Sequence, residues 1–196
     1  MKIIEDGSPY YIRFTHDKIE ETINLAKKLF EYDKNLMQNG FDYINMNLAN
    51  SLNFFRFSPV YNNLPQMNIS RATYFISKPK FRFPPHTDGL NHKWGINYPI
   101  LILDDKCNTN WYSNIEEYEV DISYSKILQN FKYENHIPVK SVVLRPDECM
   151  LINIGLFHNW DNSKSDNYRI VLTTRLEDHL YDRYDFDDAK KMLFGS

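Results

Sequence analysis

Between residues 68 and 176, this chain of 196 residues consists of short runs of β-branched and aromatic residues. Pro, Gly, Asn and Asp separate the runs, as is typical of strands joined by turns. Seven or eight short strands of this kind predict a mainly β fold in which two sheets face each other, a jelly roll. The runs are Ile69, 72–76, 97–103, 111–112, 141–144, 150–154 and 169–176.

The first part of the chain has a helical pattern instead. Apolar residues recur at spacings of three and four between residues 16 and 32, after Thr15 as a predicted N-cap. This pattern predicts an amphipathic helix that packs on the core, and residues 45–56 are consistent with a second helix. A further short helix is expected near the C-terminus, over residues 189–194.

Length and composition indicate one domain spanning residues 1–196, with an N-terminal helical buttress at about 1–65 and a jelly-roll core at about 68–176. The formal net charge of −3 argues against a general nucleic-acid binder, which is normally basic. The start of the chain lacks the apolar segment of a signal peptide, and no apolar run is long enough to cross a bilayer. We therefore expect a cytoplasmic protein without a membrane partner, and the sequence indicates no particular oligomeric state.

Two histidines and one aspartate are candidates for a metal site. His86 and Asp88 are separated by one residue, and His158 lies 70 residues beyond Asp88. On a strand, side chains two residues apart point to the same face, and His158 would arrive from a separate strand. Two neutral imidazoles and one carboxylate are the ligands of non-haem Fe(II) sites. The alternative for the short motif alone is a turn with a local side-chain hydrogen bond.

Arg169 is the candidate partner for a carboxylate. It follows His158 by 11 residues, and the intervening residues 159–167 form turns readily. A turn there would bring Arg169 and His158 to one cavity. A planar guanidinium can hold a carboxylate through two parallel hydrogen bonds, which a lysine cannot do. The alternative is a surface arginine paired with Asp or Glu.

These residues stand within a longer ordered series that resembles the 2-oxoglutarate- and Fe(II)-dependent oxygenases, in particular small microbial or viral members related to the prolyl and aspartyl hydroxylases. The resemblance covers roughly residues 70 to 176. The segments that carry it are 83–89, 94–100, 108–112, 144–153, 158–160 and 168–169.

The resemblance implies a double-stranded β-helix, the jelly roll of this superfamily. It implies that His86, Asp88 and His158 bind Fe(II), and that Arg169 binds the distal carboxylate of 2-oxoglutarate. The implied reaction uses O2 and couples oxidative decarboxylation of 2-oxoglutarate to hydroxylation of a second substrate. We expect that substrate to be a small molecule or a peptide, with an amino-acid side chain as the leading prediction.

The chain departs from the family pattern at one position. Some branches have a serine two residues after the arginine as a second partner for the carboxylate, and here that position is Val171. A tyrosine from another strand could serve instead, as in the prolyl-hydroxylase-like branches, and Tyr74 and Tyr98 are the candidates. Asn97 is a further candidate for contact with the co-substrate.

Two other functions are compatible with the same residues. One is a jelly-roll binding protein that keeps the fold, with or without a metal, but catalyses nothing. The other is a metal-dependent hydrolase or isomerase that uses the three ligands with Zn²⁺ or Mn²⁺. Such an enzyme would have no need for Arg169.

Overall fold

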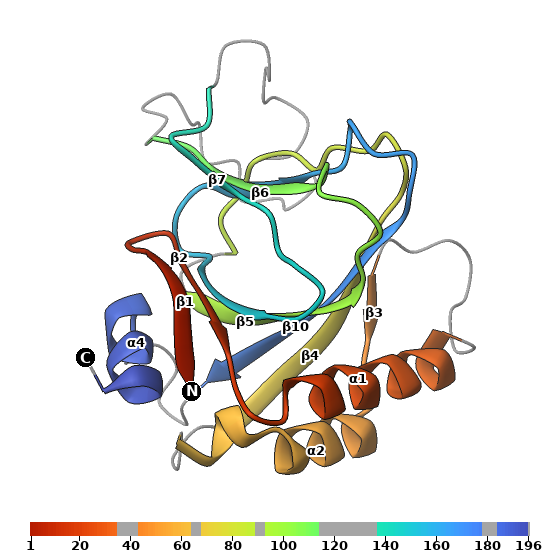
Figure 1. Cartoon of the computed structure of the whole chain (residues 1–196), viewed down its shortest axis with the longest axis vertical. Coiled ribbons are helices and arrows are strands. Elements are labelled where there is room, and N and C mark those ends of the chain that lie inside the picture. The colour runs from red at the N-terminus through yellow and green to blue at the C-terminus, as the bar shows by residue number, and fades with distance from the viewer. Residues whose placement is uncertain (35–42, 64–67, 89–92, 114–136, 178–183, 196) are drawn as a thin grey trace.

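The computed structural model describes all residues except 35–42, 64–67, 89–92, 114–136, 178–183 and 196. Two antiparallel sheets face each other, with the smaller one at the top of Figure 1. The larger sheet has the order β1-β2-β8-β5-β10-β4-β3 and the smaller the order β7-β6-β9. The strands are β1 (Lys2–Gly7), β2 (Tyr11–Thr15), β3 (Tyr43–Asn45), β4 (Asn68–Ser77), β5 (Trp94–Leu101), β6 (Asn108–Trp111), β7 (Lys140–Val142), β8 (Cys149–Asn153), β9 (His158–Asp161) and β10 (Arg169–Glu177). The predicted mainly β jelly-roll fold with supporting helices is confirmed.

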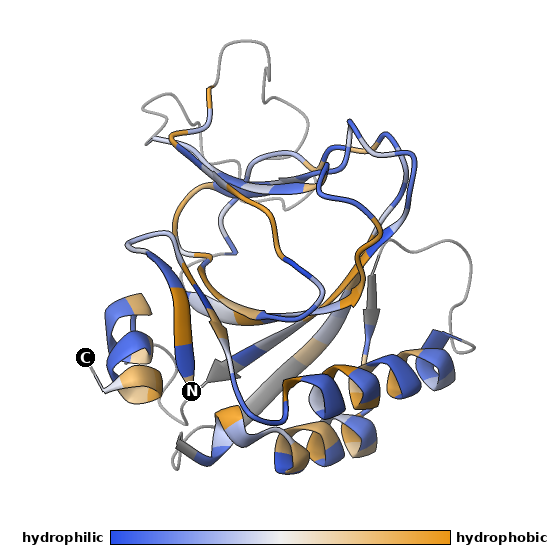
Figure 2. Ribbon diagram, viewed as in Figure 1, coloured by the Kyte–Doolittle hydropathy of each residue, from blue (hydrophilic) through white to orange (hydrophobic). Residues whose placement is uncertain are grey.

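Helices cover the outer face of the larger sheet. Helices α1 (Ile19–Asp33) and α2 (Leu48–Phe57) lie side by side below it in Figure 1, followed by the 3-10 helix η2 (Pro59–Asn63). Helix α4 (Phe186–Phe194) lies beside β1. Hydrophilic and hydrophobic residues alternate along α1 in Figure 2, as expected for a helix with one buried face. None of the described helices has the length and apolar character needed to cross a membrane.

The N-terminal region differs in part from its prediction as a helical buttress, because it also contributes β1, β2 and β3. Strand β2 pairs with β8 and thereby extends the larger sheet. Thr15 is the last residue of β2, and α1 begins only at Ile19, without a side-chain cap. Strand β1 is an edge strand with mostly exposed residues, so its sequence lacks the apolar alternation that indicates a half-buried strand.

The two faces of the larger sheet pack against different partners. Along β10, Ile170 and Leu172 belong to the core beneath the helices, whereas Val171 packs in a second core toward the smaller sheet. This alternation follows from the two-residue period of a strand. Arg169, Val171, Thr173 and Arg175 consequently share the face that looks into the space between the sheets, where they line a cavity.

Candidate metal centre and its cavity

His86, Asp88 and His158 converge although they come from distant parts of the chain. Each offers one ligand atom, and the three atoms lie within 4.8 Å of one another. The segment that carries His86 runs antiparallel to β9, and the backbone N–H groups of His86 and His158 each donate to the other residue's carbonyl at 2.9 Å. The backbone thereby fixes the two imidazoles side by side, with ring centroids 4.6 Å apart.

Backbone carbonyls orient both imidazole rings. The Nδ1 atom of His86 lies 3.0 Å from the carbonyl oxygen of Pro84, and that of His158 lies 2.9 Å from the carbonyl oxygen of Leu156. A carbonyl oxygen only accepts hydrogen bonds, so each Nδ1 carries the proton and donates it. In a neutral ring the Nε2 lone pair is then available for a metal, and such second-partner hydrogen bonds are typical of metal-binding histidines.

The Asp88 carboxylate lies between one histidine and one arginine. Its Oδ1 is 3.3 Å from His86 Nε2, and its Oδ2 accepts a hydrogen bond of 2.5 Å from Arg175 Nη2. Burial alone would raise the pKa of Asp88, but a protonated His86 and the Arg175 guanidinium outweigh it and hold that pKa well below its usual range. Burial lowers the pKa of His158 to about 4. At neutral pH the carboxylate is therefore ionised and the His158 imidazole is neutral, the forms in which both bind metals.

The short distance between His86 Nε2 and Asp88 Oδ1 also has a chemical consequence. With the ring proton on Nδ1, both atoms are hydrogen-bond acceptors, and two acceptors at 3.3 Å repel each other unless a cation or a proton lies between them. A metal ion bound by both atoms removes this conflict. The arrangement thus fits a cation site better than an empty polar cluster.

A cavity opens from the three residues into the space between the sheets. Its empty volume, including the open mouth, is about 450 Å³. Apolar residues form much of its wall, and Asp88, Arg169 and Arg175 are its charged members. The lining residues are Phe75, His86, Asp88, Asn97, Thr109, Ile152, Ile154, His158, Asn159, Trp160, Arg169, Val171, Thr173 and Arg175.

Two buried donor atoms at this cavity have no acceptor in the described part of the chain. Arg169 is 6% exposed, and its Nη2 has no hydrogen-bond partner among the described residues. The same holds for Nε1 of Trp160, whose ring stacks on Phe83 with centroids 4.0 Å apart. Asn97 receives a hydrogen bond of 2.7 Å from Thr173 on its side-chain oxygen. Buried donors without partners are rare in proteins, and here they indicate a missing ligand with acceptor atoms.

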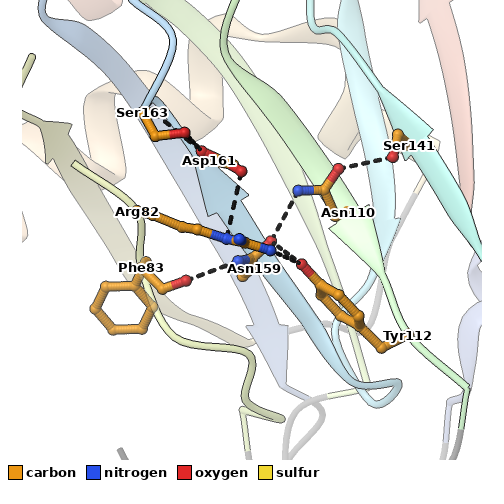
Figure 3. Close-up of polar contacts among 8 residues, drawn as sticks. All are labelled: Arg82, Phe83, Asn110, Tyr112, Ser141, Asn159, Asp161 and Ser163. Atoms are coloured by element: carbon orange, nitrogen blue, oxygen red, sulfur yellow. Dashed lines mark hydrogen bonds and ion pairs between the residues drawn. The ribbon is translucent and has the colours of Figure 1, made fainter. Parts of the chain in front are cut away.

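A polar network in the smaller sheet supports the metal-site segment (Figure 3). The Asn159 amide donates to the carbonyl oxygen of Phe83 at 2.7 Å and accepts from Asn110 and Tyr112. Arg82 lies between Asp161 and Tyr112, with its Nη2 3.0 Å from the tyrosine hydroxyl. These contacts tie residues 82–86 to β6 and β9 and hold His86 beside His158.

The structure brings five of the seven predicted site residues to this cavity: His86, Asp88, His158, Arg169 and Asn97. Their binding roles stay predictions. The two tyrosines lie on the other face of the sheet, fully buried under the helices. Tyr74 donates to the carbonyl oxygen of Ala26 at 3.2 Å, and Tyr98 donates to the Tyr61 hydroxyl at 2.9 Å.

The prediction that Tyr74 or Tyr98 contacts the co-substrate therefore conflicts with their positions. Neighbouring residues on a strand point to opposite faces, so Asn97 and Tyr98 cannot both reach one cavity. Tyr74 is likewise excluded because Phe75, the next residue of β4, lines the cavity.

Arg175 is the residue of the site that the sequence analysis missed. It pairs with Asp88 and lines the cavity from the same strand as Arg169. The signal was present in the sequence, because the two arginines are six residues apart on a predicted strand. Side chains an even number of residues apart on a strand point to the same face. If Arg169 faces the cavity, Arg175 is therefore expected to face it too.

Solved structures with the same fold are known. The non-heme alpha-ketoglutarate-dependent carbocyclase SnoK from nogalamycin biosynthesis matches with a TM-score of 0.59 and 11% identity, over 85% of this chain and 78% of its own. HygX from Streptomyces hygroscopicus, with nickel and 2-oxoglutarate bound, matches with a TM-score of 0.56 and 7% identity, over 89% and 85%. The epimerase SnoN of the same biosynthesis matches with a TM-score of 0.54 and 10% identity, over 86% and 77%.

At these identities the similarity shows the fold alone. No protein-family model matches the sequence, and no curated protein is significantly similar to it. What the neighbours bind and catalyse is therefore a guide to a proposal, and the residues of this chain have to support it.

Proposed function

We propose that this protein is a 2-oxoglutarate- and Fe(II)-dependent oxygenase. The observation that carries the proposal is the cluster of His86, Asp88 and His158 in the same cavity as the buried guanidinium of Arg169, whose Nη2 has no hydrogen-bond partner among the described residues. Two imidazole nitrogens and one carboxylate oxygen suit a ferrous ion with open positions for other ligands. The bound nickel and 2-oxoglutarate of HygX add support, because that enzyme has the same fold.

The charges of the cavity fit a dianionic co-substrate. Asp88 contributes −1, while Arg169 and Arg175 contribute +1 each, and no other charged residue lines the described cavity. A ferrous ion raises the sum from +1 to +3, and bound 2-oxoglutarate returns it to +1. A buried site favours such partial neutralisation because uncompensated charge is costly there.

Each residue has a separate task in this proposal. His86, Asp88 and His158 would hold the iron, and Arg175 would hold the second oxygen of Asp88 so that only one oxygen faces the metal. Arg169 would bind the distal carboxylate of 2-oxoglutarate, and Asn97 and Trp160 would offer further N–H groups. The apolar walls would exclude water. When bound, the ferrous ion and 2-oxoglutarate would supply the electrons that activate O2, a chemistry that the protein side chains lack.

For the second substrate we propose an amino-acid side chain, free or within a peptide, and hydroxylation as the outcome. The resemblance of residues 70 to 176 to the prolyl and aspartyl hydroxylases supports this choice. The neighbours catalyse varied reactions, since they include a carbocyclase and an epimerase. A hydrolase or isomerase that uses the same ligands would leave the buried Arg169 without a task, so the arginine favours the oxygenase.

A turnover screen tests the proposal. Purified protein with Fe(II), 2-oxoglutarate and O2 is incubated with amino acids, peptides and nucleotides, and succinate and product masses are measured. We expect succinate formation that depends on Fe(II), rises with an amino-acid or peptide substrate, and accompanies the gain of one oxygen atom by that substrate. The Asp88→Ala variant is the control. Stimulation by nucleotides alone would contradict the proposed substrate class, and no succinate under any condition would contradict the proposed activity.

A further inference from the structure

Directly across from Arg169, on the neighbouring strand β4, lies Ser77. It is fully buried, and its hydroxyl group has no hydrogen-bond partner among the described residues. We propose that Ser77 is the second residue that binds the distal carboxylate of the keto acid, together with Arg169. This inference rests on the proposed function. Some branches of the family have a serine two residues after the arginine as the second partner of the carboxylate, and because this chain has Val171 there, Ser77 would take that role.

The sheet register puts the two side chains on the same face. Residues that are directly opposite in an antiparallel pair point to one side of the sheet, and their Cβ atoms lie roughly 4.5–5.5 Å apart. Ser77 is two residues beyond Phe75 on β4, so the two side chains point to the same face of the sheet. Phe75 lines the cavity. Ile76, between them, packs against the core beneath the helices. Ser77 is not itself among the residues that line the cavity, but the register puts its side chain on the same face as Arg169, directly beside a residue that does.

A single carboxylate ligand could accept hydrogen bonds from both Arg169 and Ser77. Arg169 Nη2 and Ser77 Oγ are both buried, and neither has an acceptor among the described residues. A carboxylate has two oxygens and can accept from both groups at once. Another buried hydroxyl of the sheet, that of Thr174, has a partner, because it forms a hydrogen bond of 2.7 Å with the Tyr61 hydroxyl of η2. Ser77 Oγ is the one buried hydroxyl oxygen without a partner among the described residues.

A keto acid without the distal carboxylate separates this role from a structural one. The charge-transfer band of Fe(II) with a chelated keto acid is titrated without O2, first with 2-oxoglutarate and then with 2-oxobutanoate. We expect Ser77→Ala to weaken 2-oxoglutarate binding roughly 10-fold, as for loss of a hydrogen bond to a charged group. The affinities for 2-oxobutanoate and for Fe(II) should not change.

Two control variants complete the experiment. Ser58→Ala removes another fully buried hydroxyl, which contacts Tyr98 on the helix side of the sheet, and it should leave 2-oxoglutarate binding unchanged. Thr109→Val removes a hydroxyl that lines the cavity from the smaller sheet, and it should also leave this binding unchanged.

Three outcomes would overturn the inference. They are an unchanged 2-oxoglutarate affinity in Ser77→Ala, an equal loss of affinity for both keto acids, and a loss that appears in Thr109→Val instead. Failure of the proposed function gives a different result, because the wild-type protein itself would then bind no 2-oxoglutarate in the presence of Fe(II).

Discussion

The two faces of the seven-stranded sheet satisfy their polar groups in different ways. On the face covered by helices, the hydroxyls of Tyr74, Tyr98 and Thr174 all have partners within the protein. On the face toward the smaller sheet, Arg169 and Ser77 are also buried, but Arg169 Nη2 and Ser77 Oγ have no hydrogen-bond partner among the described residues. Buried polar groups are usually paired, and on the cavity face a bound ligand would supply the acceptors that Arg169 and Ser77 lack.

This contrast leads to a general expectation for mutations. Substitutions on the helix-covered face should change the free energy of unfolding and leave ligand binding intact. Substitutions on the cavity face should weaken ligand binding and leave the free energy of unfolding nearly unchanged, because the side chains there have their partners in the ligand and not in the protein.

The largest effect is expected from Asp88→Ala. It removes one of three metal ligands, and we expect the affinity for Fe(II) to fall by roughly 100-fold or more, since even partners outside the ligand shell contribute about 10- to 100-fold. Anaerobic titration with Fe(II) measures the change. Asp6→Asn is the matched control, because Asp6 of β1 pairs with Lys190 of α4 and takes no part in the cluster. Retained Fe(II) affinity in a folded Asp88→Ala protein would exclude Asp88 as a ligand.

Arg169→Ala should come next and should affect only the co-substrate. Removal of one member of a buried charge pair typically costs about 3–5 kcal/mol, which corresponds to a loss of 2-oxoglutarate affinity of roughly 100-fold or more. The affinity for Fe(II) should stay within about threefold. Arg169→Lys keeps the charge but not the planar fork, so it should recover only part of the loss. Equal losses for the metal and the co-substrate would refute the assigned role.

Much of the fold was predictable from the chain because the strand and helix periods are local properties. The strands around Thr73, Asn97 and Ile152 lie where the sequence pattern put them. The hairpin of β1 and β2 was missed in two ways. Strand β1 is an exposed edge strand without apolar alternation, and the buried aromatic and β-branched residues of β2, Tyr11–Thr15, were overlooked although they have the composition of a strand that pairs with β8.

Site residues could be predicted where the residue type alone indicates the role. They could not be predicted where the role depends on which face of a strand the side chain points to. His86, Asp88 and His158 were found from their ligand types. The tyrosines were misplaced because the inference considered what a phenol can bind and not which face its strand position allows. Arg175 and Ser77 were missed for the same reason, since register and parity reveal both of them.

Smaller effects are expected on the helix-covered face. Tyr74→Phe and Tyr98→Phe each remove one buried hydroxyl and its hydrogen bond, which should lower the free energy of unfolding by about 1 kcal/mol per substitution. Chemical denaturation measures this. The affinity for 2-oxoglutarate should remain that of the wild type, and a clear decrease for either variant would bring the tyrosines back as co-substrate partners.

The smallest effect is expected from Asp33→Asn, at the end of α1. Asp33 is fully buried, accepts from Asn47 and Asn50, and its pKa is raised by burial. A raised folded-state pKa means that stability is lost as the pH rises through it, because the folded protein then has to hold a buried charge.

The variant cannot ionise at this position, so its stability relative to the wild type should be greater at pH 7 than at pH 3.5. Urea unfolding at the two pH values measures the difference. A difference that is independent of pH would show that Asp33 ionises in the folded protein as readily as in the unfolded chain.

The central claim is that three side chains and one guanidinium form a site for ferrous iron and a keto diacid. Its most direct test is the visible spectrum of the wild-type protein after anaerobic addition of Fe(II) and then 2-oxoglutarate. We predict a metal-to-ligand charge-transfer band that saturates at one keto acid per chain and is absent in Asp88→Ala. Folded wild-type protein that shows no such band would contradict the account.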